Sequence, residues 1–503
     1  MFNKKIKWFQ LSQRQRMSPF PNYYSMEAVC KEMKKVIGYA YQQNIMIFEG
    51  NNFYSYSDKK DHEHVGRAIL KKVINDQAIF LKLAKKQKEF YRRFYKFLRE
   101  HNKPSQLRKN SSKQLAGFHQ EFERRYKEIY SHYFPILSIE NYFFQYLRDY
   151  INSLEKDNKQ AAHDIDILIT ERKAMINRQE RVAALKTCVI IKENQKWFNV
   201  FKCKDFEKLR IKVNQDKKLY NMIKKHEKDF FWITRDYDDP VLSFDDFIKR
   251  FQEHLKKDPE LELNKIEKED LKLAQDIRGI YRKLKIDKKH QRLFQTLREG
   301  IYYKELRKWI VSKSLYYYDP ILSEIGRRGG LSMRQARFLK TSDVKDMLLK
   351  NKDMSLEVNQ RIKLSVWHTV KGKASVFTGR TAQEYYNYLV EVDPKAKVLQ
   401  CEAVSAGVAR GPVKIVINPD AFHKVKKGDI IATLQATPVF SHVLELASGL
   451  ICDGGPGITS HPATLAREAG IPGVIKARMA TKIFKDGEMV EVDGNTGMVK
   501  RLS

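Results

Sequence analysis

The amino-acid sequence predicts a multidomain protein with a mainly α-helical N-terminal region and a C-terminal α/β domain. A chain of 503 residues exceeds what one hydrophobic core usually organises. Twelve of its 23 glycines lie after residue 398, but only three of its 58 aromatic residues do. The apolar pattern changes at the same place, from helical three- and four-residue spacing to short runs separated by glycine. We therefore expect the main boundary near Asp393 and Pro394.

Basic residues are concentrated before this boundary. The formal net charge is +34, and the residues from 398 onward hold twelve Lys/Arg against ten Asp/Glu, so the preceding region carries +32. Such a charge is compatible with nucleic-acid binding. Runs such as residues 82–89 and 282–292, however, mix basic, acidic and apolar residues at helical spacing. This pattern favours solvated helix faces, and nucleic-acid binding is the less favoured interpretation.

The sequence also disfavours a disulfide framework, a metal site and a membrane-spanning protein. The five cysteines show no C-x-x-C spacing, which argues against a disulfide framework or a zinc site. His62 and His64 alternate with Asp61 and Glu63, and such near neighbours on a helix cannot all face one ion, so no metal site is predicted. No apolar run approaches the roughly 18 residues that span a bilayer, and the first residues do not resemble a secretory leader. We expect a cytoplasmic protein.

The N-terminal region divides by pattern. Residues 1–60 are predicted to be a mixed α/β segment, with a hairpin over residues 44–56 around Gly50. Residues 61–391 are predicted to be helical, with one possible division into two subdomains near 190–240. Helix breaks are expected at Pro104, Pro135, Pro240 and Pro320 and over residues 327–332, and an N-cap at Ser243. Residues 392–398 are predicted to be a linker.

The residues after the linker are predicted to form short strands and helices. Apolar runs at residues 414–417, 429–433, 449–452 and 474–475 indicate strands, and residues 489–499 indicate a closing hairpin. Short helices are expected over 442–448 and 461–469. The result is a compact α/β domain over residues 399–503.

The stretch from Cys452 to Val474 carries the chemistry. A strand leads into a glycine-rich turn, and Pro462 suits the first position of the helix that follows. The unpaired backbone N–H groups and the dipole of such a helix start favour a bound anion. A neutral imidazole is nucleophilic near neutral pH, so His461 is predicted to receive a phosphoryl group, with hydroxyl donors from Thr459 and Ser460.

Other residues of this stretch are predicted to support the anion. Gly455 and Gly457, with the neighbouring Gly454, let the backbone approach a phosphoryl group. Arg467 is predicted either to bind phosphate or to be an ordinary surface salt-bridge partner.

These motifs resemble a known family. Gly457-Ile-Thr-Ser-His461, Ala466-Arg-Glu468 and Gly470-Ile-Pro-Gly-Val474 resemble the mobile phosphohistidine domain of phosphoenolpyruvate-utilising enzymes, found in phosphoenolpyruvate synthase, pyruvate phosphate dikinase and rifampicin phosphotransferase. The resemblance implies a β/β/α swivelling domain, with His461 phosphorylated and Thr459 as its supporting hydroxyl. Pro456 and Pro462 depart from the family pattern and narrow the backbone options of the turn. The alternative is an inactive relic in which His461 only caps the helix.

The helical region shows a looser resemblance to the acceptor-binding region that precedes the carrier in phosphoenolpyruvate synthase-like proteins. This likeness implies an acceptor-binding or docking region over residues 61–391. Its polar candidates are Arg298, Glu299, Arg307, Glu324, Arg327 and Arg328.

Two parts of these enzymes have no counterpart motif in the sequence. We see no glycine-rich segment of the ATP-grasp type and no barrel after the carrier, so the chain itself is expected to bind no cofactor. A separate ATP-grasp protein is expected to bind ATP and Mg²⁺ and to load His461. The sequence thus predicts a phosphotransferase component of the phosphoenolpyruvate synthase type, for which an anionic acceptor would suit the basic region. The alternative is a non-catalytic basic protein that binds RNA or a protein and retains the carrier fold as a module.

Overall fold

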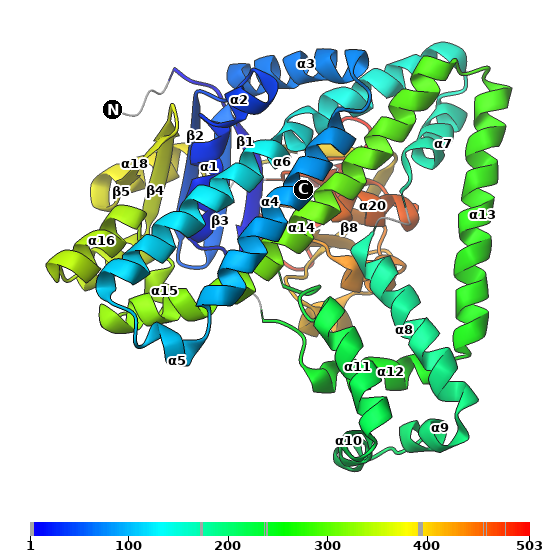
Figure 1. Cartoon of the computed structure of the whole chain (residues 1–503). Helices are drawn as coiled ribbons and strands as arrows, with labels where there is room; N and C mark the ends of the chain where they lie inside the picture. Colours follow the sequence, from blue (N-terminus) through cyan, green and yellow to red (C-terminus); the bar gives the residue numbers. More distant parts are fainter. Residues whose placement is uncertain are drawn as a thin grey trace. The chain divides into compact units, whose positions relative to one another are not determined.

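The computed structural model of the chain describes residues 5–502, except 172–174, 236, 238, 239, 391–395, 456, 459 and 478. It contains two compact units (Figure 1). The first comprises Met1–Leu70, His101–Tyr142 and Pro320–Ser503, and the second comprises Lys71–Glu100 and Phe143–Asp319. No helix among the described residues is both long enough and apolar enough to cross a membrane.

The first unit contains an antiparallel five-stranded sheet in the order β1-β3-β2-β4-β5. Its strands are β1 (Trp8–Gln15), β2 (Gln43–Glu49), β3 (Asn52–Asp58), β4 (Ser365–Val370) and β5 (Lys373–Phe377). The hairpin predicted around Gly50 is confirmed as β2–β3, and Gly50 has the positive φ that such a tight turn requires. The sheet unites residues from both sides of the predicted boundary at residue 60.

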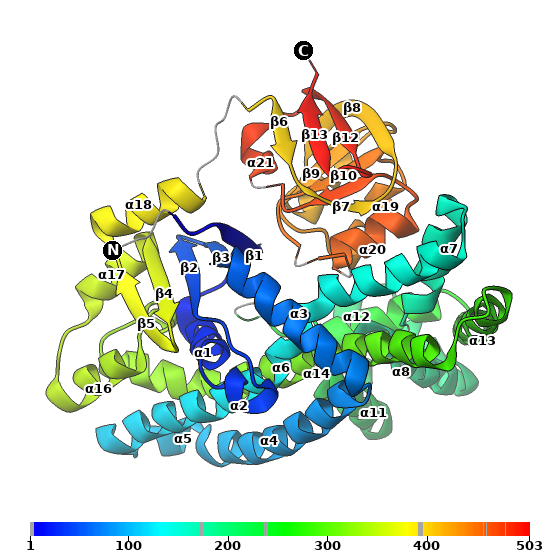
Figure 2. The same cartoon turned by 90° about the horizontal axis from the view of Figure 1, so that it is seen from above.

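The same unit contains the eight-stranded sheet of the C-terminal domain, in the order β6-β13-β12-β8-β9-β10-β11-β7 (Figure 2). Its strands are β6 (Val398–Gln400), β7 (Glu402–Ser405), β8 (Val408–Ile415), β9 (Ile430–Thr433), β10 (Gly449–Cys452), β11 (Gly473–Ile475), β12 (Met489–Asp493) and β13 (Met498–Arg501). The predicted α/β character and the closing hairpin β12–β13 are confirmed. Val398, the last residue of the predicted linker, already belongs to β6.

Alternating residues of the central strands in this domain face two different layers. Ile430 and Ile451 pack with α21 (Ala480–Ile483). Ile431 and Leu450 pack instead with α19 (Ser441–Leu444) and α20 (His461–Glu468). Because side chains alternate across a strand, β9 and β10 form a layer between these helices. The 3₁₀ helices η1 (Pro419–Lys424) and η2 (Pro438–Phe440) complete the domain.

The remaining helices account for the mainly helical N-terminal region. Those within the first unit are α1 (Pro19–Val29), α2 (Met33–Ile37), α5 (Pro104–Leu107), α15 (Met333–Ala336), α16 (Thr341–Lys350), α17 (Ser355–Lys363) and α18 (Gly379–Leu389). Those within the second are α7 (Asn158–Ile169), α8 (Ile176–Glu193), α9 (Gln195–Phe201), α10 (Phe206–Gln215), α11 (Lys217–Phe230), α12 (Phe244–Leu255) and α13 (Pro259–Lys283). Residues of both units belong to α3 (Lys59–Asn75), α4 (Ile79–His101), α6 (Ser112–Leu154) and α14 (Lys288–Arg328).

Some of the predicted helix starts and breaks are confirmed, and others are wrong. Pro104 begins α5 and Ser243 forms a full capping box with Asp246, as expected. The breaks predicted at Pro135 and Pro320 are wrong, because α6 and α14 continue through them. The side chains that neighbour these prolines in the sequence are buried, namely Tyr133, Phe134, Ile136, Tyr318, Ile321 and Leu322. Their burial offsets the cost of an interior proline, about 3 kcal/mol.

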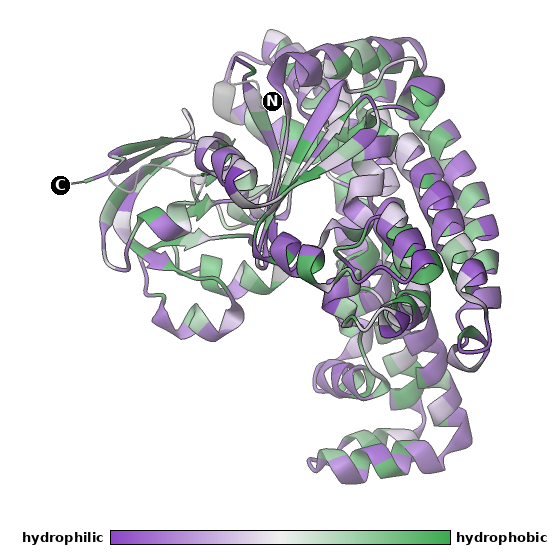
Figure 3. Ribbon diagram, turned by 90° about the vertical axis from the view of Figure 1, so that its left-hand side faces the viewer, coloured by the Kyte–Doolittle hydropathy of each residue, from purple (hydrophilic) through white to green (hydrophobic). Residues whose placement is uncertain are grey.

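The charged runs lie on solvated helix faces. On α4, Lys82, Lys85 and Lys86 are exposed, whereas Leu83 and Ala84 between them are buried. Figure 3 shows the same alternation of hydrophilic and hydrophobic residues along the long helices. The amphipathic spacing of this run is therefore that of a packed helix with a basic outer face.

Candidate active site

The sheet of the C-terminal domain places the glycine-rich turn between β10 and α20. β10 pairs in parallel with β9 and β11, so the carboxyl ends of these strands meet at one edge. The chain then passes through Gly454 and Gly455 before α20 begins at His461. Gly455 has φ +113°, and a Cβ atom there would lie 3.2 Å from Ile475. The turn therefore requires glycine at this position.

His461 is the first residue of α20 and is half-buried. Ser460 is the N-cap, with extended backbone, and its carbonyl accepts the helical hydrogen bond of the Thr464 N–H at 3.0 Å. Pro462 follows in the first turn, as predicted. An imidazole at this position lies beside a helix N-terminus, where first-turn N–H groups lack helical partners.

Ser460 does not use its hydroxyl in the way that an N-cap serine usually does. The side chain is 5% exposed, makes no capping hydrogen bond, and its Oγ has no hydrogen-bond partner among the described residues. A buried hydroxyl without a partner costs about 1–3 kcal/mol. Ser460 thus presents an unused donor and acceptor next to His461. Thr459 and Pro456 lie outside the described residues.

Thr433 adds a second hydroxyl on the same side of the sheet. It is fully buried, its Oγ1 has no partner among the described residues, and it pairs in register with Cys452. Cys452 packs against Ala463 of α20. Because residues paired in register share a face, Thr433 points into the layer that contains α20. No sequence pattern singles out Thr433, since a threonine at the end of a strand is common.

Arg467 contacts the turn itself. Its Nη1 donates to the carbonyl oxygens of Ile458 at 2.9 Å and Val404 at 3.0 Å. These bonds hold the segment that leads into His461 against β7. Neither alternative considered for Arg467 included this role, and phosphate binding by its guanidinium stays a prediction. Gly457 supports the same segment, because its carbonyl accepts from the Ser460 N–H at 2.9 Å.

Asp453 is a residue that the sequence interpretation missed. It directly follows β10, is fully buried, and its Oδ2 accepts hydrogen bonds from the Thr481 hydroxyl at 2.5 Å and the Thr481 N–H at 3.3 Å. Burial raises the pKa of this carboxyl to about 6, against the opposing effect of Thr481. The acidic residue between an apolar strand and a glycine turn was the available signal.

The six acceptor candidates all lie on α14 but fall into both units. In the second unit, Glu299 accepts two hydrogen bonds from Arg292, the Arg298 guanidinium donates to the Leu168 carbonyl, and Arg307 contacts the Tyr237 hydroxyl at 3.4 Å. The contacts of Arg298 and Glu299 are those of helix packing. The proposed acceptor role of these residues stays a prediction.

In the first unit, the structure brings Glu324, Arg327 and Arg328 together. Both arginines donate to the Glu324 carboxylate, and their hydrogen bonds, that of Arg327 above all, lower the pKa of Glu324 to about 2. Arg328 also donates to the carbonyls of Leu107 and Asn110, whereas the Arg327 side chain is 60% exposed. Of the three, Arg327 has the side chain most open to a ligand.

The side chains that could bind a metal ion are His, Cys, Asp and Glu. Within the part of the chain that the structure describes, His, Cys, Asp and Glu form no group of three or more suited to a metal ion.

Comparison with known proteins assigns the C-terminal domain. Residues 425–497 match the family model described as "PEP-utilising enzyme, mobile domain". The C-terminal domain is thus a mobile domain of the phosphoenolpyruvate-utilising enzyme type.

Three curated relatives match the same part of the chain. An uncharacterized phosphotransferase of Bacillus subtilis, YvkC, is 40% identical over 101 residues, which are 20% of this chain and 12% of the relative. A probable phosphoenolpyruvate synthase of Archaeoglobus fulgidus is 40% identical over 95 residues, 19% of this chain and 12% of the relative. The phosphoenolpyruvate synthase of Aeropyrum pernix is 40% identical over 111 residues, 22% of this chain and 13% of the relative. The chain therefore covers only about an eighth of the length of these proteins.

Among solved structures, aconitase X of Thermococcus kodakaraensis in its holo form aligns at 21% identity and a TM-score of 0.18. The alignment covers 22% of this chain and 100% of that chain. A score this low supports no inference.

Proposed function

We propose that the chain is the carrier component of a phosphotransferase, in which His461 receives a phosphoryl group and passes it to an acceptor bound by the helical region. The observation that carries this proposal is the half-buried imidazole at the start of α20 beside the buried hydroxyl of Ser460, which has no hydrogen-bond partner within the described part of the chain. A tetrahedral phosphoryl group on His461 would supply the acceptor oxygens that the Ser460 hydroxyl and the helix N–H groups lack. Relatives named phosphotransferase and phosphoenolpyruvate synthase support the same chemistry.

The transfer has two displacement steps. An imidazole nitrogen of His461 attacks the phosphorus of the donor, an N–P bond forms, and the P–O bond to the donor's leaving group breaks with its electron pair on that oxygen. An acceptor oxygen then attacks the same phosphorus, the N–P bond breaks, and its electron pair returns to the imidazole. The acceptor proton leaves to solvent or to a nearby base. Apart from the covalent bond to His461, the protein contributes by positioning the reactants and stabilising the charge that develops on the phosphoryl oxygens.

Movement of the carrier is the second part of the proposal. Residues 398–503 swivel about a linker at 392–397, because Val398 already belongs to β6, and its six residues reach at most about 22 Å when extended. The donor is a separate ATP-grasp protein that binds ATP and Mg²⁺. The composition boundary at the linker supports independent folding of the two parts.

Radiolabelling tests the proposal. The purified chain is incubated with an ATP-grasp protein from the same source and with ATP labelled on either the β- or the γ-phosphate, and in parallel with labelled phosphoenolpyruvate. Wild type is expected to gain a label that is lost in acid and kept in base, and the His461→Ala variant is expected to gain none.

His423→Ala is the matched control. His423 is an exposed histidine of the same domain, and its ring nitrogen contacts the Asp420 carbonyl in η1. This variant is expected to label like wild type. Equal labelling of His461→Ala and wild type would rule out His461 as the carrier residue.

A further inference from the structure

The edge of the C-terminal domain that bears His461 contacts the N-terminal part of the first unit. Because β10 and β11 are parallel, the segments that follow them lie at the same edge of the sheet. The segment after β10 includes Gly454 and Gly457, and the segment after β11 includes Lys476 and Met479. Both segments meet residues of β1 or α6, or the core of the five-stranded sheet, within the same compact unit.

Gly457 lies against Asn141 of α6. A Cβ atom at Gly457 would lie 2.6 Å from Asn141 Oδ1, and the three atoms nearest to it would all belong to Asn141. The φ angle of Gly457 is not positive, so the close contact and not the backbone is what requires glycine here. The Gly457 carbonyl accepts from the Ser460 N–H at 2.9 Å. Asn141 therefore contacts the segment that leads directly into His461.

The C-terminal domain also covers part of β1, which is an edge strand of the five-stranded sheet. An edge strand leaves backbone groups without sheet partners, and such edges are commonly covered by another part of the chain. A Cβ atom at Gly454 would lie 2.7 Å from the Gln13 carbonyl oxygen. The Lys476 ammonium lies 4.4 Å from the centre of the Phe9 ring, within the range of a cation–π contact. Met479 packs against the apolar core of the same sheet.

A chain of contacts joins β1 to α6. The Phe9 ring stacks on His62 with a centroid distance of 4.5 Å, and His62 is hydrogen-bonded to the Tyr41 hydroxyl at 2.9 Å. This hydroxyl donates to the Ser138 hydroxyl of α6 at 3.0 Å. Ser138 precedes Asn141 by three residues, so the two side chains lie on the same face of α6. The parts of β1 and α6 that meet the C-terminal domain are thus connected to each other.

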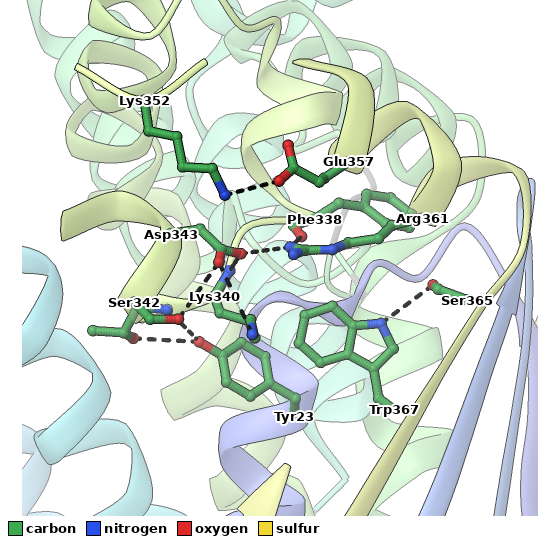
Figure 4. A network of polar contacts seen from close by, with 11 residues as sticks. Tyr23, Phe338, Lys340, Ser342, Asp343, Lys352, Glu357, Arg361, Ser365 and Trp367 are labelled. Carbon is green, nitrogen blue, oxygen red and sulfur yellow. Dashed lines mark hydrogen bonds and ion pairs between the residues drawn. The ribbon is translucent and has the colours of Figure 1, made fainter. Parts of the chain in front are cut away.

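The beginning of α6 is fixed by a second network. The Tyr24 hydroxyl is hydrogen-bonded to His119 of α6 at 2.9 Å and to the Thr341 hydroxyl at 2.8 Å. Thr341 begins α16, and Asp343 of this helix accepts a hydrogen bond from the buried Arg361 guanidinium (Figure 4). Because α6 is held at both places, the position of Asn141 is well determined relative to the five-stranded sheet.

We propose that β1 and α6 form a docking site for the edge of the C-terminal domain that bears His461, and that Asn141 is a positioning residue that holds this edge through Gly457. Docking covers the glycine-rich turn, and His461 is half-buried in the docked arrangement. Water competes with the acceptor for the phosphoryl group, and a covered site excludes water. The docked state therefore lengthens the lifetime of the phosphohistidine.

The effect on the phosphohistidine rests on the proposed function, whereas docking of the unphosphorylated chain does not. The two are therefore measured separately. Docking is followed in the unphosphorylated full chain by hydrogen exchange of the β1 backbone amides. The lifetime is followed by mass spectrometry of the His461 phosphate after loading with phosphoramidate, which phosphorylates imidazole nitrogens with release of ammonia and needs no partner protein.

Gly457→Ala and Asn141→Gln test the docking site, because they enlarge the same contact from opposite sides. In both variants the β1 amides are expected to exchange at least about threefold faster than in wild type. The lifetime of the His461 phosphate is expected to fall at least about threefold. Adding Asn141→Ala to Gly457→Ala removes the amide that the new methyl group meets, so both values are expected to return toward wild type. A change within the turn alone would not be rescued in this way.

Gly117→Ala is the matched control, since a Cβ atom at this position of α6 meets nothing within 4 Å. It is expected to change neither value. Melting temperatures identify any variant that does not fold, and if Gly457→Ala fails, Asn141→Gln decides because it leaves the turn unchanged. Wild-type exchange of β1 in Asn141→Gln, or no rescue in the double variant, overturns the docking site. Faster exchange with an unchanged phosphate lifetime overturns the protective role. Absence of any phosphate on His461 contradicts the proposed function instead, and the exchange result still decides docking.

Discussion

Asp453 shows, at the scale of a single residue, how burial beside the candidate site changes acid–base behaviour. Its pKa is raised to about 6 by burial, whereas the unfolded value lies near 3.8. The folded state therefore binds this proton more tightly than the unfolded state does. The contribution of Asp453 to stability is therefore fully present below about pH 4, and it is lost as the pH rises through about 6.

The Asp453→Asn variant is accordingly expected to be more stable than wild type at neutral pH. The shift of about two units corresponds to about 3 kcal/mol in the free energy of unfolding. The gain is expected to shrink as the pH falls from 6 to 4, because wild-type Asp453 is then protonated. Denaturant unfolding of both proteins, from neutral pH down to pH 4, measures the difference in their free energies of unfolding. A difference that does not change with pH would contradict the raised pKa of Asp453.

Arg467 acts on the turn through two backbone carbonyls. Arg467→Lys keeps the charge but shortens the side chain, so the ammonium nitrogen ends one bond nearer the backbone than Nη1, which makes both bonds. We expect a loss of about 1–3 kcal/mol in stability and a lower rate of His461 labelling. Arg410→Lys serves as control, because Arg410 pairs with Glu491 on an exposed strand face. Similar effects of the two substitutions on labelling would count against a positioning role.

At the scale of elements, the start of α20 could be predicted from its local sequence. Pro462 in the first turn and the short helix itself were predictable from residue preferences alone. The arrangement of Asp453, Thr433 and Arg467 around the turn was not, because it depends on the parallel register of β9 and β10 and on bonds to distant carbonyls.

The same limit applies to the long helices. Sequence rules place breaks at Pro135 and Pro320, but the buried neighbours that keep α6 and α14 continuous are known only from the packing. Likewise, the five-stranded sheet pairs residues 43–48 with residues 365–370, and no local pattern indicates this pairing. Sequence patterns therefore predicted the structure correctly where neighbouring residues determine it, and failed where packing between distant residues does.

Replacement of Ser460 by Ala tests the role of the helix start. Since the hydroxyl has no partner among the described residues, we expect the stability of the unphosphorylated protein to fall by less than about 0.5 kcal/mol or to rise. The phosphohistidine, by contrast, should form more slowly and hydrolyse faster. Ser448→Ala is the control, because the Ser448 hydroxyl donates to the Gly428 carbonyl at 2.7 Å; it should lower stability without changing labelling. Unchanged labelling of Ser460→Ala would contradict this role.

At the scale of the whole molecule, the chain joins two regions of different composition. The region before residue 398 carries a charge of +32, whereas the residues from 398 onward carry +2. Under the proposed function, this difference in charge would favour an anionic acceptor bound by the basic region.

The linker offers a test at this scale. Deleting residues 392–395 of the linker removes about 14 Å of reach. We expect loading or transfer of the phosphoryl group to fall about tenfold or more, while the melting temperature stays that of wild type. Loss of transfer together with loss of stability would show a folding defect instead, and unchanged transfer would argue against a swivelling carrier.

The most direct test of the central claim is to locate the phosphoryl group by tandem mass spectrometry of the loaded wild-type chain, with fragmentation that preserves N–P bonds. We predict a single histidine-linked phosphate, on His461, in the peptide that contains α20. A phosphate on another residue, or none after exposure to ATP with an ATP-grasp partner and to phosphoenolpyruvate, would contradict the account.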